Sequence, residues 1–321
     1  MSDEVTVTVV IPSVGRPAVV RAVKSALDQT RAPLEVIVVF DLDVIPDVDL
    51  PQDPRVRTLT SGGGRGGNFA RGIGVKAARG ALIAFLDDDD RWRPAKLERQ
   101  VDAYLDARRR GIELIVATAA QMVDAAGRDL QVLPRQLPAD GQSIPDYLLR
   151  RRSVSYGDAM LCSSMLLCSR SLLHAVALDT RSSIHDDWDW LIRAGRHPGV
   201  RLQMIAEPLL EYTRQEEGRS VSRSGRWRQS ADWFRRNRIH LSTREYGDGL
   251  LTVTLPLAVA AGDRRAALSV LGRALRGGRP GFTALAFAVL TMTVPARCLG
   301  QLSGAVHRLV RTLGLDRAGR A

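Results

Sequence analysis

Residues 81–92 read Ala-Leu-Ile-Ala-Phe-Leu-Asp-Asp-Asp-Asp-Arg-Trp. The six apolar residues at its start predict a strand buried on both faces, as in a parallel sheet. The four carboxylates that follow, Asp87–Asp90, repel one another unless a cation or strong donors neutralise them. One or two aspartates would suffice to start a helix, so four of them favour a Mg²⁺ or Mn²⁺ site at the end of the strand.

The chain before this stretch predicts a strand–helix–strand unit. Val5–Ile11 is rich in β-branched residues and stops at Pro12, and Leu34–Phe40 is a second apolar run that ends at Asp41. An amphipathic helix is predicted between them, from Arg16 to Gln29. This spacing predicts a parallel pair of strands and an α/β fold.

A glycine-rich segment, Ser61–Asn68, precedes a predicted helix over Phe69–Arg79. Glycine-rich backbone before a helix can bind phosphate, but glycines also form plain flexible turns, and the sequence leaves both interpretations open. It is not a dinucleotide-binding fingerprint, because no buried strand leads directly into Gly-x-Gly-x-x-Gly.

Several elements are predicted beyond the aspartates. They are a helix over Pro94–Arg109, a strand over Glu113–Ala119, a loop over 124–147, a buried strand or acceptor-facing segment over Met160–Cys168, and two closing strands, Arg201–Ile205 and Leu209–Arg214, around a Glu207-Pro208 turn.

Another acidic group, Asp186, Asp187 and Asp189, begins a predicted helix within Ile184–Arg193. Carboxylates at this place stabilise the positive end of a helix dipole, which is the structural explanation. The aromatic, partly apolar surroundings could also raise the pKa of one of them towards that of a general base.

Charge is distributed unevenly along the 321 residues. Residues 218–321 hold 18 arginines and five carboxylates, whereas residues 1–217 hold 28 basic and 30 acidic side chains. The C-terminal third is therefore a basic, helical region whose partner would be anionic lipid or nucleic acid. Predicted helix Arg226–Ile239 combines arginines with Trp227, Trp233 and Phe234, which suits either a membrane surface or a helical cap packed on the body.

The three cysteines, Cys162, Cys168 and Cys298, are too few for a disulfide framework or a zinc site. The N-terminus carries Asp3 and Glu4 and enters a strand at once, so no signal peptide is expected, and no apolar run reaches the length of a membrane span. These features predict a cytoplasmic protein, with peripheral association at the inner face of the plasma membrane as the expectation for the basic region.

The order of these motifs resembles the family-two glycosyltransferases. The matching motifs are Val-Val-Ile-Pro-Ser with Arg16, Val-Ile-Val-Val-Phe-Asp41, Asn68-x-Ala-Arg-x-x-Gly74, Phe85-Leu-Asp-Asp-Asp-Asp-x-Trp92 and Asp186-Asp-Trp-Asp. The resemblance covers about residues 5–222 and implies the A-type glycosyltransferase fold. In that fold a Rossmann-like, mainly parallel sheet is sandwiched by helices. Residues 1–222 would form the catalytic domain and residues 223–321 a helical appendage.

The resemblance also assigns residues to the nucleotide. Asp41 would accept a hydrogen bond from uracil N3, although Phe40 stands where the family usually has a first aspartate. Arg214, in the segment that closes over the diphosphate, would bind phosphate, but Gln215 and Glu216 replace the histidine that many relatives have there. The other residues implied in nucleotide binding are Pro12, Val14, Arg16, Arg65, Asn68, Asp87 and Asp88.

By the same resemblance, Asp89 coordinates Mn²⁺ or Mg²⁺ together with Asp87, as in the family's Asp-x-Asp element. Asp187 is the general base, supported by Asp186. The implied reaction is an inverting single displacement from a nucleotide-diphosphate sugar, with a UDP-sugar as the expected donor, to a hydroxyl of a saccharide or lipid-linked acceptor.

Three other functions are weighed against this one. A sugar-1-phosphate nucleotidyltransferase would place its glycine-rich loop directly after the first strand, where this chain has Pro12-Ser-Val-Gly. Nucleic-acid binding by the basic region is not expected, since only 5% of residues are aromatic and no nucleic-acid motif is present. A non-catalytic relative is opposed by the presence of both the aspartate cluster and Asp187.

Overall fold

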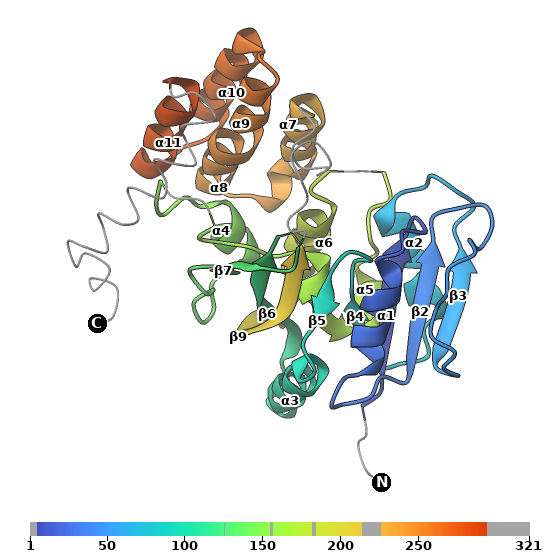
Figure 1. Ribbon diagram of the computed structural model, residues 1–321. Helices are drawn as coiled ribbons and strands as arrows, with labels where there is room; N and C mark the ends of the chain where they lie inside the picture. Colours follow the sequence, from blue (N-terminus) through green and yellow to red (C-terminus); the bar gives the residue numbers. More distant parts are fainter. Residues whose placement is uncertain (1–4, 125, 155–156, 182–183, 214–225, 294–321) are drawn as a thin grey trace. The chain divides into compact units, whose positions relative to one another are not determined.

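The computed structural model describes residues 5–124, 126–154, 157–181, 184–213 and 226–293 (Figure 1). The chain divides into two compact units. The sheet unit comprises Met1–Ile144 and Ala159–Glu217, and the helical unit comprises Pro145–Asp158 and Gly218–Ala321. The sequence did not indicate that 145–158 joins the helical unit, and the boundary predicted after residue 222 lies outside the described residues.

The first half of the sheet is parallel, with the order β3-β2-β1-β4. Its strands are β1 (Val7–Ser13), β2 (Glu35–Phe40), β3 (Val56–Thr60) and β4 (Leu82–Phe85). Every residue of β1, β2 and β4 is buried, which explains their continuous apolar runs. The predicted strand–helix–strand unit is confirmed.

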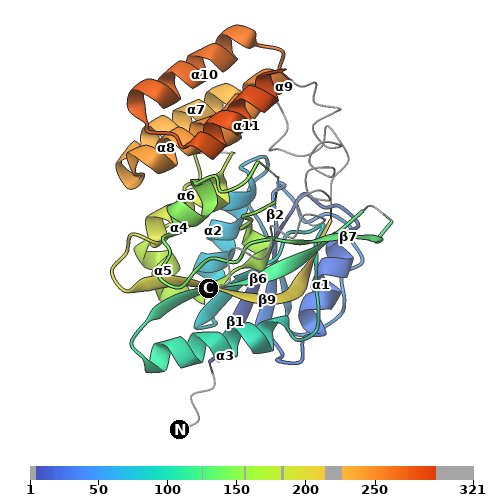
Figure 2. The same cartoon turned by 90° about the vertical axis from the view of Figure 1, so that its left-hand side faces the viewer.

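Helices α1 (Val19–Leu27) and α2 (Gly67–Ala77) cover opposite faces of these strands (Figure 2). Helix α2 approaches β1 so closely that a Cβ atom at Gly74 would lie 2.3 Å from a methyl carbon of Val10. This close packing fixes the rotation of α2 about its axis and therefore the direction in which Asn68 and Arg71 point.

The second half of the sheet is mixed. Strands β8 (Leu167–Ser169), β6 (Glu113–Val123), β9 (Val200–Thr213) and β5 (Arg91–Trp92) continue the order, and β7 (Asp129–Leu133) pairs with β6. Strand β8 runs antiparallel to both β4 and β6, whereas β9 runs parallel to β6. Helix α3 (Lys96–Arg109) packs on β6, and the short α5 (Arg170–Ala175) and α6 (Asp186–Ala194) follow β8.

Two sequence predictions are wrong in this half. The two strands predicted around Glu207-Pro208 are one strand, β9, because irregularities in its pairing with β6 absorb the extra residues: Ile205 pairs with Thr118 and Pro208 with Ala119. The predicted loop over 124–147 contains β7 and the start of α4 (Ile144–Leu149). Four of the five β7 residues are exposed, including Leu130 and Val132, so β7 lacks the continuous buried apolar run of β1, β2 and β4.

The helical unit is built around a long bent helix. Helix α8 (Thr243–Gly249) continues through a π-helical turn at Leu250–Thr254 into α9 (Leu255–Ala260). The helices α7 (Trp227–Arg236), α10 (Arg264–Gly277) and α11 (Phe282–Thr293) pack against it. Among the described residues, no helix combines the length and the apolar character needed to cross a bilayer.

Asp248, which is fully buried, holds the helical unit together. Its carboxylate accepts hydrogen bonds from the backbone amides of Arg151 and Gly281, at 3.1 and 2.8 Å, and from the Arg244 side chain at 3.0 Å. Because Arg151 belongs to the 145–158 segment, these bonds help to explain why that segment packs with residues far along the chain.

The aromatic residues of α7 do not form the surface that the sequence suggested. Trp233 and Phe234 are fully buried, and Trp227 packs against the cluster of Ala258, Ala266 and Ala267. A helix with apolar residues on one side looks the same in sequence whether that side meets lipid or the protein's own core. The exposed apolar side chains of this unit lie instead mainly on α10 and α11.

Candidate active site

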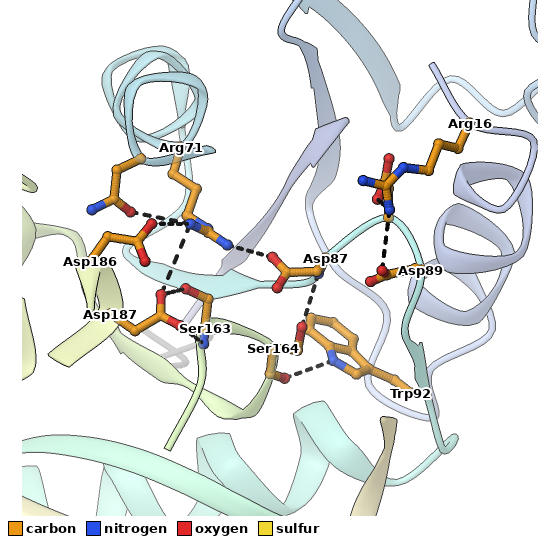
Figure 3. A network of polar contacts seen from close by, with 11 residues as sticks. Arg16, Arg71, Asp87, Asp89, Trp92, Ser163, Ser164, Asp186 and Asp187 are labelled. Atoms are coloured by element: carbon orange, nitrogen blue, oxygen red, sulfur yellow. Dashed lines mark hydrogen bonds and ion pairs between the residues drawn. The ribbon is translucent and has the colours of Figure 1, made fainter. Parts of the chain in front are cut away.

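Two groups of carboxylates meet beside the carboxyl ends of β1 and β4. Asp87–Asp90 follow β4, and Asp186 and Asp187 begin α6, a hundred residues later. An arginine on α2 lies between the groups (Figure 3). We call this set of side chains the acidic site.

Asp88 and Asp89 face the end of β1. Asp88 accepts a hydrogen bond from the Ser13 hydroxyl at 2.7 Å and another from the Val14 amide at 3.4 Å. The Arg16 guanidinium lies 3.6 Å from Asp88 and 3.3 Å from Asp89. Burial raises the pKa of Asp88, although the Ser13 hydrogen bond and the Arg16 charge oppose that shift.

Ionisation of Asp89 and Asp90 is disfavoured by their burial and by the neighbouring carboxylates. Burial and the charges of Asp87 and Asp88 raise the pKa of Asp89 to about 6, despite Arg16. Burial and the charges of Asp87 and Asp89 raise the pKa of Asp90 well above its usual range, while the Thr213 amide donates to it at 3.1 Å. A cation bound here would stabilise the charged forms of these carboxylates.

Arg71 connects the two acidic groups (Figure 3). Its guanidinium lies 2.5 Å from Asp87, 3.6 Å from Asp186 and 3.9 Å from Asp187. Its side chain is only 8% exposed. Burial disfavours its charge, but the three carboxylates outweigh that effect and raise the pKa of Arg71 above its usual value. Arg71 therefore stays charged and holds the two groups together.

Asp187 is held in a fixed orientation. The Ser163 backbone amide donates to one of its oxygens at 3.2 Å, and the Ser163 hydroxyl donates to the other. Burial and the neighbouring Asp186 raise the pKa of Asp187 to about 6, against the effect of Arg71. A carboxylate with this pKa is deprotonated at neutral pH yet basic enough to take a proton from a hydroxyl as it reacts.

Asp41 organises the glycine-rich segment. It accepts hydrogen bonds from the backbone amides of Arg65 and Gly66, both at 2.8 Å, and from the Ser61 hydroxyl. Gly66 caps α2 with a φ of 89°, a conformation that side chains disfavour. The segment is thus neither a plain flexible turn nor a loop with all its amides available to phosphate, since two of them already bind Asp41.

The structure brings most of the predicted residues to one edge of the sheet. Pro12, Val14, Arg16 and Asp41 lie at or just after the ends of β1 and β2, beside Asp87–Asp89 at the end of β4. Arg214 lies outside the described residues.

The other two predicted nucleotide contacts are engaged elsewhere. Asn68 is buried, where it accepts from Arg71 at 3.1 Å and donates to the Asp179 carbonyl at 3.1 Å. The Arg65 guanidinium lies 4.2 Å from the centre of the Phe69 ring. Asn68 therefore supports Arg71. It can reach the Arg71 side chain because it lies one helical turn earlier on α2.

Sequence reasoning missed Arg71, Ser163 and Ser164 as parts of the site. The only signal for Arg71 was its place three residues after Asn68 in a motif already singled out. Six carboxylates near one another also require a buried cation, but the sequence does not say which of many arginines supplies it.

Comparison with known proteins gives one family. A family model described as "Glycosyl transferase family 2" matches residues 8–176, just over half of the chain. The match includes β1, β4 and the four aspartates, and it ends before Asp186.

Three curated relatives are similar to parts of the chain. The amylovoran biosynthesis glycosyltransferase AmsB of Erwinia amylovora is 30% identical over 167 residues, 50% of this chain and 53% of its own. The succinoglycan biosynthesis protein ExoO of Rhizobium meliloti (strain 1021) is 45% identical over 87 residues, 26% of this chain and 25% of its own. The Escherichia coli UDP-Glc:alpha-D-GlcNAc-diphosphoundecaprenol beta-1,3-glucosyltransferase WfgD is 34% identical over 108 residues, 32% of this chain and 42% of its own. The chain thus spans about half or less of these relatives.

Proposed function

The chain belongs to glycosyltransferase family 2, and from this premise we propose that it transfers a sugar from a UDP-sugar to a hydroxyl of a saccharide or lipid-linked acceptor, with inversion at the anomeric carbon. The observation that carries the proposal is the acidic site, in which Arg71 joins a donor-side group of carboxylates to a single well-oriented carboxylate, Asp187. The names of AmsB and ExoO, which specify amylovoran and succinoglycan biosynthesis, support a role in polysaccharide biosynthesis, and the name of WfgD, which specifies a diphosphoundecaprenol, supports a lipid-linked acceptor.

Asp187 is the general base of the proposed reaction. It takes the proton of the acceptor hydroxyl while that oxygen attacks the anomeric carbon on the face opposite the diphosphate. One displacement of this kind inverts the configuration and requires no covalent sugar–enzyme intermediate. Ser163 orients the base, and Asp186 shares Arg71 with it.

The donor side would hold the nucleotide at the ends of β1, β2 and β4. Pro12, Val14 and Asp41 are the proposed base and ribose contacts, and Arg16 is placed beside Asp88 and Asp89, where a diphosphate would approach. Arg214 is the proposed phosphate contact from the segment after β9. UDP as the nucleotide is supported by the name of WfgD, which specifies UDP-Glc.

The donor set fits Mn²⁺ or Mg²⁺. Among the described residues no three His, Cys, Asp or Glu side chains converge as a ready-made metal site. Such cations are, however, often held by one or two carboxylates together with substrate phosphates. Asp89, whose pKa is raised by burial and by the neighbouring carboxylates, and Asp87 would hold the cation. When bound, it would supply Lewis-acid stabilisation of the charge on the departing diphosphate.

Replacing Asp89 by Ala is expected to abolish the Mn²⁺-dependent part of UDP binding. Calorimetric titration of UDP with Mn²⁺ and with EDTA measures this part directly. Asp106→Ala, on the exposed side of α3, is the matched control and should bind as the wild type does. Undiminished Mn²⁺-dependent affinity in Asp89→Ala would remove Asp89 from the metal site.

The rate of transfer is expected to fall at acidic pH. Asp187, with a pKa of about 6, must be deprotonated to act, so below pH 6 turnover should drop about tenfold per pH unit. The measurement is UDP release from UDP-glucose in the presence of an added saccharide acceptor, between pH 4.5 and 8, at saturating donor and Mn²⁺. A profile that stays flat down to pH 4.5 would mean that Asp187 is not the base.

The helical unit is proposed to bind the anionic inner face of the plasma membrane from the cytoplasm. Residues 264–293 contain five arginines and no carboxylate, and they expose Leu268, Leu275, Phe282 and Val289. Arginine beside exposed apolar side chains suits the interface of an anionic bilayer. A lipid-linked acceptor would be presented there.

Phe282→Asp is expected to weaken sedimentation with anionic phospholipid vesicles about tenfold or more, since burial of a Phe side chain contributes roughly 1.5–3 kcal/mol. Ile239→Asp is the matched control, because Ile239 is 82% exposed in the same unit but lies outside α10 and α11. Equal loss in both variants, or no loss in Phe282→Asp, would contradict this binding face.

A further inference from the structure

A short buried turn connects the base to the donor-side carboxylates. Ser163–Met165 form one 3₁₀ turn. Ser163 donates its amide and hydroxyl to Asp187, and the Ser164 hydroxyl accepts from the Asp87 backbone amide at 3.0 Å. The turn therefore sets the distance between the base and the strand end that carries the aspartate cluster.

The opposite side of this turn is held by two side chains. The Trp92 indole N–H donates to the Ser164 carbonyl at 3.0 Å, as Figure 3 shows. The Gln100 side-chain amide donates to the Met165 carbonyl at 2.9 Å and to the Val116 carbonyl on β6 at 2.8 Å. The carbonyls of Ser164 and Met165 are thus both held by side chains from the core.

Trp92 and Gln100 both contact Lys96, a fully buried lysine on α3. The Lys96 ammonium nitrogen donates to Gln100 Oε1 at 2.8 Å and lies 4.0 Å from the centre of the Trp92 ring. In the part of the chain that the structure describes, no carboxylate lies within ion-pair distance of Lys96. Burial lowers the pKa of Lys96 well below its usual range. Burying an amine without a carboxylate is costly, and an apolar side chain would fill the space at a lower cost.

Lys96 completes the hydrogen bonding of the Gln100 amide. The carbonyls of Val116 and Met165 can only accept, so the Gln100 NH₂ group faces them, and Lys96 donates to the Gln100 oxygen on the other side. Without Lys96, the Gln100 oxygen would be buried without its donor, and the Trp92 ring would lose the group packed on its face. The two side chains that hold the turn would then be less firmly fixed, and Ser163 would be oriented less precisely against Asp187.

We infer that Lys96 is a positioning residue for transfer: through Gln100 and Trp92 it fixes the Ser163–Met165 turn, which in turn orients Asp187 toward the acceptor hydroxyl. The inference rests on the proposed role of Asp187 as the base. Lys96 itself touches neither donor nor acceptor, so its loss lowers turnover without weakening nucleotide binding.

Lys96→Met tests this inference against Lys76→Met, a matched change at an exposed lysine on α2. UDP-glucose turnover and UDP affinity in Mn²⁺ are measured on the full chain. Lys96→Met is expected to lower kcat about tenfold or more, as small misplacements of reacting groups do, with the UDP Kd changed less than twofold. Lys76→Met should match the wild type. A folded Lys96→Met protein with kcat within twofold of the wild type would overturn the inference.

Trp92→Phe is the second variant, in case Lys96→Met does not fold. It keeps an aromatic ring over Lys96 but removes the indole N–H that binds the Ser164 carbonyl, together with part of the ring system, so kcat should again fall with the UDP Kd unchanged. Retained kcat would count against the inference.

A spectroscopic measurement separates failure of this inference from failure of the proposed function. The Trp92 indole ¹H–¹⁵N resonance should shift in Lys96→Met and stay in place in Lys76→Met. If the wild-type chain releases no UDP, the proposed function fails, and this resonance alone decides whether Lys96 organises the turn. An unshifted resonance in Lys96→Met would overturn the inference.

Discussion

Replacing Asp187 by Asn is expected to reduce UDP-glucose turnover by about 10²–10⁴-fold and to leave UDP affinity within about twofold of the wild type. Asn has the same shape and can still accept a hydrogen bond from Ser163, but it cannot take the proton of the attacking hydroxyl. Initial rates of UDP release and calorimetric UDP binding give the two quantities.

Asp186→Asn is the control for this prediction. Both variants remove one negative charge from the start of α6, and both residues lie within 4 Å of the Arg71 guanidinium. If Asp187 acts as the base, Asp186→Asn should lose less than about tenfold. Equal losses in the two variants would indicate that charge balance around Arg71, rather than proton transfer, controls the rate.

Replacing Arg71 by Met is expected to lower the free energy of unfolding by about 3–5 kcal/mol, the usual consequence of removing one member of a buried ion pair. Asp87, Asp186 and Asp187 would then face one another without their shared cation. Urea unfolding at pH 7.5, followed by circular dichroism, measures the change.

Arg16→Met provides the comparison. Arg16 also contacts the aspartate cluster, but its side chain is 52% exposed, so its loss should cost no more than about 1 kcal/mol. A similar, small effect in both variants would contradict the view that Arg71 is the cation on which the acidic site depends.

The location of the acidic site could be predicted from the sequence because the strands that position it are short, continuous apolar runs. A continuous apolar run of six residues that ends in four aspartates predicts a buried strand with its carboxylates at one edge of a sheet, and β4 confirms that strand. The parallel order of β1, β2 and β4 then places Pro12, Val14 and Asp41 near the same edge.

The interior of the site could not be predicted from the pattern of residues. Arg71 and Lys96 are both cations on helices, and their burial depends on how closely α2 and α3 pack on the sheet. Ser163 and Ser164 belong to a turn whose neighbours in space are Trp92 and Gln100, far away in sequence. Such contacts are set by tertiary packing, not by local periodicity.

The aromatic residues of the basic region illustrate the same limit. From the sequence, Trp233 and Phe234 suited either a membrane surface or a packed helical cap, and in the structure they fill the core of the helical unit. Periodicity shows that one side of a helix is apolar, and only the packing of its neighbours shows what covers that side.

Calorimetric titration of the wild-type chain with UDP, GDP and dTDP, each with Mn²⁺ and with EDTA, tests the central claim most directly. The claim is that the carboxyl ends of β1, β2 and β4 bind a sugar nucleotide through its base and its metal-bound diphosphate. It predicts that UDP binds in the presence of Mn²⁺, much more tightly than GDP. With EDTA, the heat of titrating UDP should fall to that of titrating buffer. Absence of metal-dependent binding for all three nucleotides would contradict it.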